Sequence, residues 1–121
     1  MLRCVIVDDS TSFLEAASSL LSRQGLSVVG VAPSAAEAVR LVEAERPDVV
    51  LVDLILGLES GFDLARRLAE VDGELVVVLI STHAESDFAD LIAATPAAGF
   101  MPKSELSGAA VRELVSARRG R

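Results

Sequence analysis

The chain has 121 residues, of which 51% are hydrophobic and 24% charged, and this composition excludes a disordered tail and a coiled coil. Its length predicts one domain with one hydrophobic core. The formal net charge is −7, from 18 acidic and 11 basic residues, so direct binding of nucleic acid is not expected, because that requires clustered Lys and Arg.

Five aliphatic runs predict β-strands. In chain order they are Leu2–Val7, Leu26–Val31, Val49–Val52, Leu75–Ile80 and Gly99–Met101. The third and fourth runs are apolar at every position, which is typical of central strands buried on both faces of a sheet. Cys4, the single cysteine, lies in the first run and is interpreted as a small buried hydrophobe, not as a reactive thiol.

Helical patterns lie between these runs, with apolar residues spaced so that they share one face. The four clearest faces are formed by Phe13, Ala17, Leu20 and Leu21; by Ala35, Ala38, Val39 and Val42; by Leu64, Ala65, Leu68 and Ala69; and by Leu106, Ala110, Leu114 and Val115. The boundary signals, in chain order, are a C-terminal Gly25, an N-capping Ser34, Pro47 after the second helix, Pro96 ending the fourth helix early, and Ser104 opening the last.

Strands and helices alternate five times, which predicts an α/β fold with a doubly wound five-stranded parallel sheet flanked by five helices. No internal linker or repeat interrupts the pattern, so residues 1–121 are expected to form a single domain. The basic end, Arg118-Arg119-Gly120-Arg121, is interpreted as a solvated helix end or the start of a linker. In such a sheet, ligands bind beyond the carboxyl ends of the strands, where the strand order reverses.

Polar residues follow four of the predicted strands, and the fold would bring them to one edge of the sheet. They are Asp8-Asp9, Asp53, Ser81-Thr82 and Lys103. Three neighbouring carboxylates repel one another, so cations would have to join them: Lys103 supplies one positive charge and Mg²⁺ would supply two more. Asp53 could then be an ionised nucleophile that forms an aspartyl phosphate, with Ser81 hydrogen-bonded to a phosphoryl oxygen.

This set of residues resembles the receiver-domain signature of two-component response regulators. The segments VIVDDS, DVVLVDLILG, VVVLISTHAES and GFMPKSEL resemble family segments in the same order and spacing, over essentially the whole chain. The resemblance implies a flavodoxin-like fold with strand order 2-1-3-4-5. It also implies a phosphorylation-activated signalling switch that is not an enzyme, apart from its own aspartyl phosphorylation and dephosphorylation.

The resemblance assigns a role to each residue around the acidic pocket. Asp53 would accept the phosphoryl group. Asp8, Asp9, Asp53 and the backbone carbonyl of Ile55 would hold Mg²⁺, with Asp9 a more direct ligand than Asp8. Lys103 would bridge to the phosphoryl group.

The resemblance also implies a switch. Ser81 would be drawn to the phosphoryl group, and Phe100, which stands where the family carries an aromatic that moves inward, would fill the space behind it. The surface formed by the fourth helix, the fifth strand and the fifth helix would change as a result.

The implied phosphodonor is a histidine kinase, a phosphotransfer protein or a small phosphodonor. The implied target is another protein or an output domain outside this chain, a DNA-binding domain being one alternative. A homodimer through the fourth helix, fifth strand and fifth helix is a further alternative. The single cysteine, the lack of signal-peptide anatomy and the shortness of the apolar runs predict a cytoplasmic protein without a membrane span.

Three features depart from the usual family pattern. Ser104 follows Lys103 where the family often has proline preceded by a cis peptide; a cis bond here would cost about 2.5–4 kcal/mol, so that geometry stays open. Gly57 replaces a common proline and is expected to loosen the loop after Asp53. Pro96 shortens a helix of the expected output surface, which puts the partner surface in doubt more than the chemistry.

Three other functions remain as alternatives. A phosphatase with an aspartyl-phosphate intermediate would carry its nucleophile in a D-x-D pattern on the first strand, where this chain has Asp8-Asp9-Ser10. A flavin-binding module would need aromatic residues to cover the ring, but Trp and Tyr are absent. A degenerate receiver that signals by binding alone would not need the full acidic set.

Overall fold

The computed structural model describes residues 1–83 and 87–120, and it has the predicted central sheet. The strands are β1 (Arg3–Val7), β2 (Ser27–Ala32), β3 (Val49–Asp53), β6 (Val76–Ser81) and β7 (Gly99–Pro102). They pair in the order β2-β1-β3-β6-β7, and each neighbouring pair is parallel. Counted along this sheet alone, the order is 2-1-3-4-5, as implied by the resemblance. The order reverses between β1 and β3, which places the switch point at their carboxyl ends.

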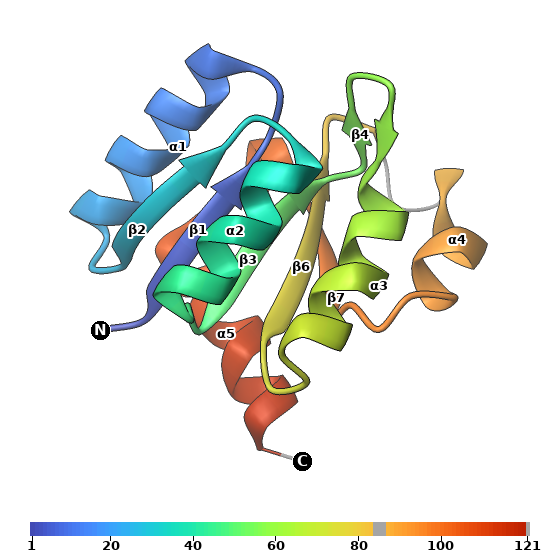
Figure 1. Ribbon diagram of the computed structural model, residues 1–121. Helices are drawn as coiled ribbons and strands as arrows, with labels where there is room; N and C mark the ends of the chain where they lie inside the picture. Colours follow the sequence, from blue (N-terminus) through green and yellow to red (C-terminus); the bar gives the residue numbers. More distant parts are fainter. Residues whose placement is uncertain (84–86, 121) are drawn as a thin grey trace.

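Five α-helices connect the strands and cover both faces of the sheet (Figure 1). They are α1 (Thr11–Arg23), α2 (Ala35–Glu45), α3 (Gly61–Val71), α4 (Ala89–Ala93) and α5 (Gly108–Arg119). The buried residues of α2 and α3 share one core cluster with Val5 and Val7, while those of α1 and α5 share the other with Cys4 and Ile6. The side chains of alternate strand residues therefore pack on opposite faces of the sheet, as the geometry of a pleated strand requires.

The central strands are fully enclosed, as their unbroken apolar runs predict. Every residue of β3 and of β6 is buried, including Asp53 and Ser81 at their last positions. Cys4 is completely buried, and burial raises the pKa of its thiol to about 12. The interpretation of Cys4 as a core residue and not a reactive thiol is therefore confirmed.

Most of the predicted helix boundaries are confirmed. The Ser34 hydroxyl accepts a hydrogen bond from the Glu37 N–H at 3.4 Å, which caps α2. Gly25 has a φ of +92° just beyond α1, and Pro47 follows the end of α2. α4 ends at Ala93, before Pro96.

One boundary prediction is wrong. Ser104 does not open the last helix; it lies in a short 3-10 helix, η2 (Lys103–Glu105). Leu106, predicted on the face of that helix, is buried but precedes it. The cap is Ser107, whose hydroxyl accepts a hydrogen bond from the Ala110 N–H at 3.0 Å. The residues directly after β7, which the apolar periodicity assigned to the last helix, form the short 3-10 helix instead.

A two-stranded antiparallel hairpin after Asp53 was not predicted. It consists of β4 (Ile55–Leu56) and β5 (Glu59–Ser60), and Figure 1 shows it beyond the carboxyl ends of the central strands. Gly57 has a φ of +61°, a positive value at the first central residue of a two-residue loop, as in type II′ turns. Proline could not adopt this angle, so glycine is required for this turn.

The remaining expectations concern local features. The peptide bond between Lys103 and Ser104 is trans. Among the helices of the described residues, none is long and apolar enough to cross a membrane. Ala84, Glu85 and Ser86 of the VVVLISTHAES segment, and Arg121 of the basic end, lie outside the described residues.

Candidate functional site

The three predicted carboxylates meet at the switch point of the sheet. Each of Asp8, Asp9 and Asp53 places a carboxylate oxygen within 4.8 Å of the other two. Asp8 is completely buried, Asp53 is buried and Asp9 is exposed. The chain turn after β1 explains this arrangement: Asp8 Oδ1 accepts a hydrogen bond from the Ser10 N–H at 2.9 Å, and the Ser10 hydroxyl caps α1.

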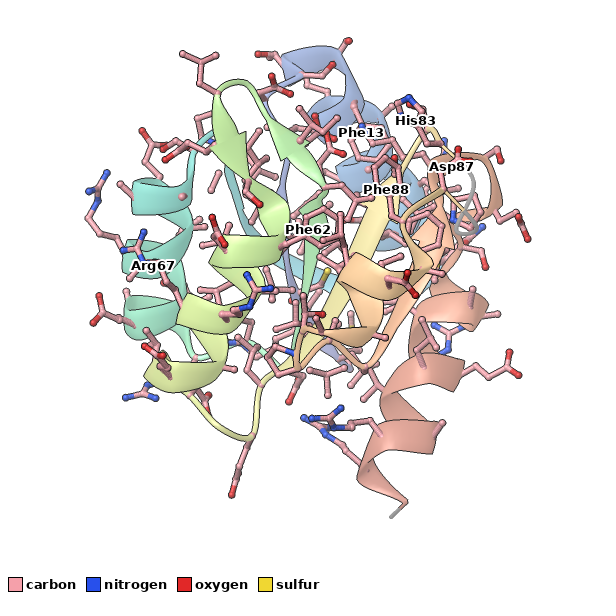
Figure 2. The ribbon with its side chains drawn as sticks, turned by 90° about the vertical axis from the view of Figure 1, so that its right-hand side faces the viewer. Phe13, Phe62, Arg67, His83, Asp87 and Phe88 are labelled. Carbon is pink, nitrogen blue, oxygen red and sulfur yellow. The ribbon has the colours of Figure 1, made fainter. Side chains whose placement is uncertain are left out.

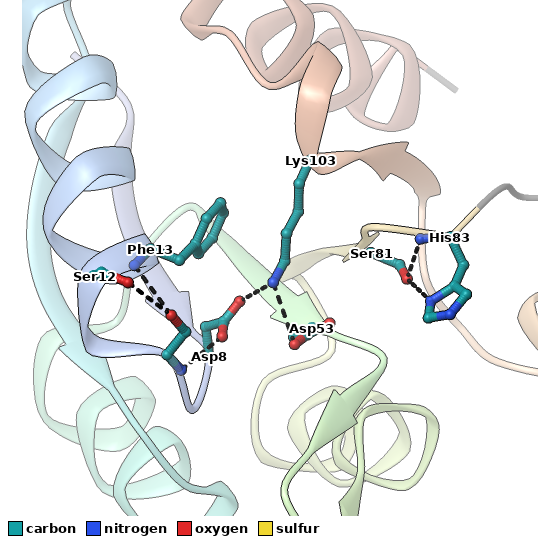
Figure 3. Close-up of polar contacts among 8 residues, drawn as sticks. Asp8, Ser12, Phe13, Asp53, Ser81, His83 and Lys103 are labelled. Carbon is teal, nitrogen blue, oxygen red and sulfur yellow. Dashed lines mark hydrogen bonds and ion pairs between the residues drawn. The ribbon is translucent and has the colours of Figure 1, made fainter.

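Lys103, the first residue of η2 directly after β7, enters the cluster (Figure 3). Its Nζ lies 2.6 Å from Asp8 Oδ2 and 3.4 Å from Asp53 Oδ2. It also lies 4.3 Å from the centre of the Phe13 ring, a cation–π distance. The ammonium is therefore held by two strands and by α1, as expected for a fixed counter-charge.

The electrostatics of Asp53 follow from this crowding. Burial raises the pKa of the Asp53 carboxyl above its ordinary value, and the neighbouring Asp8 carboxylate raises it further. The Lys103 ammonium and the Ile55 N–H lower it, but they do not cancel the rise. The Lys103 ammonium therefore does not offset the combined effect of burial and the Asp8 charge on the pKa of Asp53.

The residues present fit a divalent cation. Asp8 Oδ2 is buried, and among the described residues its partner is the Lys103 ammonium, 2.6 Å away. Asp8 shares this single ammonium with Asp53, so three neighbouring carboxylates face one positive charge, and their mutual repulsion favours a further cation. A set of carboxylate oxygens at the edge of a sheet, one of them exposed, is the oxygen-only environment that Mg²⁺ prefers.

The raised pKa of Asp53 predicts a pH-dependent stability in the absence of metal. The folded chain holds this proton more tightly than the unfolded chain, so the contribution of Asp53 to the free energy of unfolding falls as pH rises above about 4. We expect the free energy of unfolding of the unsubstituted chain, minus that of Asp53→Asn, to decrease from pH 4 to neutral pH. Urea denaturation with a chelator at several pH values measures this difference, and a difference that stays constant would contradict the assignment.

Ser81 lies at the end of β6 and is turned toward His83. The Ser81 hydroxyl accepts a hydrogen bond from the His83 N–H at 3.0 Å and lies 3.4 Å from His83 Nδ1 (Figure 3). The His83 ring packs edge-on against Phe88 at 5.7 Å, and Phe88 lies 6.1 Å from Phe62 of α3 (Figure 2). His83 is the single histidine of the sequence, and no sequence pattern predicts this polar and aromatic connection to Ser81.

Phe100 and Ile55 lie where the sequence places them relative to the strands. Phe100 is partly buried in β7 and packs against the core cluster of α2 and α3. Ile55 is 51% exposed in β4, the first strand of the hairpin. Its side chain is therefore not part of the buried core, and the role expected of this residue is that of its backbone carbonyl.

Comparison with known proteins identifies the family. Residues 4–115 match the family described as the response regulator receiver domain. The chain belongs to the response regulator receiver family.

Individual relatives agree with this assignment. The response regulator GacA of Pseudomonas viridiflava is 32% identical over 118 residues, which cover 97% of this chain and 53% of the relative. The response regulator UvrY of Escherichia coli K12 is 28% identical over 97% of this chain and 52% of its own length. The chain therefore spans about half the length of the curated relatives it matches.

Solved structures show the same likeness. The signal receiver domain of the response regulator NarL from Mycobacterium tuberculosis superposes with a TM-score of 0.84, at 31% identity, covering 99% of this chain and 98% of that one. A two-component response regulator of the LuxR family from Aurantimonas sp. SI85-9A1 gives a TM-score of 0.86 at 30% identity, covering 100% and 87%. Because the chain belongs to the receiver family, we no longer consider the phosphatase and the flavin-binding module as alternatives.

Proposed function

We propose that this receiver domain accepts a phosphoryl group on Asp53, in the presence of Mg²⁺, and acts as a signalling switch. The observation that carries the proposal is the meeting of Asp8, Asp9 and Asp53 with Lys103 at the switch point of the sheet. The same observation argues against a degenerate receiver that only binds partners, because such a chain would have no need for the crowded carboxylates. Beyond its own phosphorylation and dephosphorylation, we expect no enzymatic activity.

The chemistry follows from the positions of the side chains. A carboxylate oxygen of Asp53 forms the new bond to phosphorus, and the bond from phosphorus to the donor atom breaks with its electron pair leaving on the donor. Lys103 neutralises negative charge beside Asp53, since its ammonium already contacts that carboxylate. Asp8, Asp9, Asp53 and the carbonyl of Ile55 would hold Mg²⁺. The metal, when bound, supplies the positive charge that keeps Asp53 ionised and offsets charge on the transferred group.

The proposed switch begins at Ser81. Its hydroxyl would leave His83 for a phosphoryl oxygen, and Phe100 would move into the space behind it. The partly buried position of Phe100 against the core supports such a change, because a small shift of the ring alters the surface of β7. Amide chemical shifts with and without beryllofluoride, a phosphoryl mimic, test this: unchanged shifts around Phe100 would refute it.

The partners of the switch follow from its chemistry and from the relatives. A histidine kinase, a phosphotransfer protein or a small phosphodonor would supply the phosphoryl group. The surface of α4, β7 and α5 would act on another protein, on a second copy of the chain, or on an output domain. A DNA-binding output domain is one alternative, supported by the LuxR-family regulator among the similar structures and by relatives about twice as long as this chain.

Intact-mass spectrometry after incubation with acetyl phosphate tests the proposed function. We expect the mass to rise by a single phosphoryl group when Mg²⁺ is present and to stay unchanged when Mg²⁺ is removed by a chelator. If Mg²⁺ makes no difference, the proposed metal site is wrong. If no phosphoryl group is gained, a beryllofluoride-binding measurement distinguishes a binding-only receiver, which fails to bind, from a receiver that requires its kinase.

A further inference from the structure

The β4–β5 hairpin carries Ile55, whose backbone carbonyl is a proposed Mg²⁺ ligand, yet the hairpin is too small to hold itself in place. It has two residue pairs, Ile55 with Ser60 and Leu56 with Glu59. A two-stranded hairpin of this size is marginal in water, so contacts outside it must fix its position. One such contact is at its tip, where a Cβ built on Gly57 would stand 3.7 Å from Asp9 Oδ2. The turn therefore lies against the proposed metal ligands.

Glu59 supplies a second external contact, on the other strand of the hairpin. Its Oε1 accepts a hydrogen bond at 3.0 Å from the N–H of Ala35, which lies 24 residues away in the sequence. Ala35 is the first residue of α2, and its N–H has no partner within that helix. The positive end of the helix dipole favours a carboxylate there, and a charged acceptor strengthens the hydrogen bond. The hairpin is thus tied to a rigid element of the fold.

The two side-chain caps of α2 are independent. Ser34 accepts from the Glu37 N–H, two residues beyond the Ala35 N–H that Glu59 engages. Ser34 belongs to the helix's own entry, whereas Glu59 belongs to the hairpin. Loss of Ser34 would therefore weaken α2 and leave the hydrogen bond between the hairpin and the helix in place, whereas loss of Glu59 would remove that hydrogen bond.

We propose that Glu59 is a positioning residue for metal binding: its hydrogen bond to Ala35 holds the hairpin, and with it the Ile55 carbonyl, against the acidic cluster. The inference rests on the proposed function, which places Mg²⁺ at that cluster. Ile55 and Glu59 lie on opposite strands and flank the same turn, so an anchor at Glu59 restrains the Ile55 backbone through the paired strands. Glu59 acts through this backbone and does not contact the metal.

Titration calorimetry with Mg²⁺ alone, on the full chain, tests the role of Glu59. Glu59→Ala is expected to weaken Mg²⁺ binding about tenfold, the lower end of the effect of removing groups that orient metal ligands. Glu59→Gln keeps an acceptor oxygen in the same place and is expected to bind Mg²⁺ nearly as tightly as the unsubstituted chain. Ser34→Ala is the matched control, expected to lower the urea midpoint while leaving Mg²⁺ affinity unchanged.

Each other outcome overturns the inference in a distinguishable way. Equal Mg²⁺ affinity in Glu59→Ala and the unsubstituted chain would reduce Glu59 to a helix cap. Equal weakening in Glu59→Gln and Glu59→Ala would assign the effect to the charge of Glu59, acting at a distance, and not to its hydrogen bond. A failure of the unsubstituted chain to bind Mg²⁺ would overturn the metal site itself, and this inference with it.

Discussion

Asp53→Asn is expected to abolish phosphoryl uptake from acetyl phosphate, from one group per chain to none detectable by intact mass. The amide has the size and shape of the carboxylate but lacks the ionised oxygen that attacks phosphorus. The fold is expected to persist, because Asp53 stands at the end of β3 and its side chain contributes charge to the site and no apolar packing. Circular dichroism and a urea midpoint at or above that of the unsubstituted chain would verify this.

The matched control is Asp63→Asn on α3. Asp63 is exposed and pairs with Arg66 at 2.8 Å on the helix surface, away from the acidic cluster. Its loss removes the same charge from the chain, so it reports any effect of net charge on the reaction. We expect uptake in Asp63→Asn to equal that of the unsubstituted chain. Phosphoryl gain in Asp53→Asn would mean that another residue is the acceptor.

Gly61→Ala is expected to destabilise the fold by about 3 kcal/mol, at the upper end of the cost of overpacking. A Cβ at Gly61 would stand 2.0 Å from the carbonyl oxygen of Asp53 and 2.8 Å from Leu54 Cα, both backbone atoms that a rotamer change cannot move. The start of α3 must therefore shift away from the end of β3, and the Gly61 N–H would lose its 2.8 Å hydrogen bond to the Leu54 carbonyl. The free energy of unfolding in urea measures the loss.

Gly73→Ala provides the control for this substitution. A Cβ at Gly73, in the turn before β6, would meet no atom within 4 Å. We expect its effect on the free energy of unfolding to stay within about 0.5 kcal/mol, as for surface substitutions. If Gly61→Ala were as neutral as Gly73→Ala, the close approach of α3 to the end of β3 would be wrong.

The sequence predicted the central sheet and the acidic cluster because both follow from one topological rule. Parallel strands end at one edge, so a polar residue after each apolar run must arrive there, and this placed Asp8, Asp53 and Lys103 correctly. To predict where each strand ends, it was enough to find the last residue of each apolar run. The predicted ends agree with the structure to within one or two residues.

The sequence did not reveal features that depend on side-chain geometry across distant segments. The two-residue strands of the hairpin are too short for any periodicity, although the Gly57-Leu58 pair is a turn signal that could have been used. The link from Glu59 to Ala35 has no local signature at all. Ser104 and Ser107 are equivalent by capping preference, and only the 3-10 turn after β7 decides between them.

Because α4 is short, its backbone hydrogen bonds are expected to open more often than those of the central sheet. None of the five residues from Ala89 to Ala93 is buried, and among the described residues no side chain caps the start of this helix, whereas every residue of β3 is buried at the centre of the sheet. Amide protons of α4 can therefore exchange with solvent through local fraying, while those of β3 require unfolding of the whole domain. α4 can therefore change its conformation on signalling while the packing that stabilises the core stays intact.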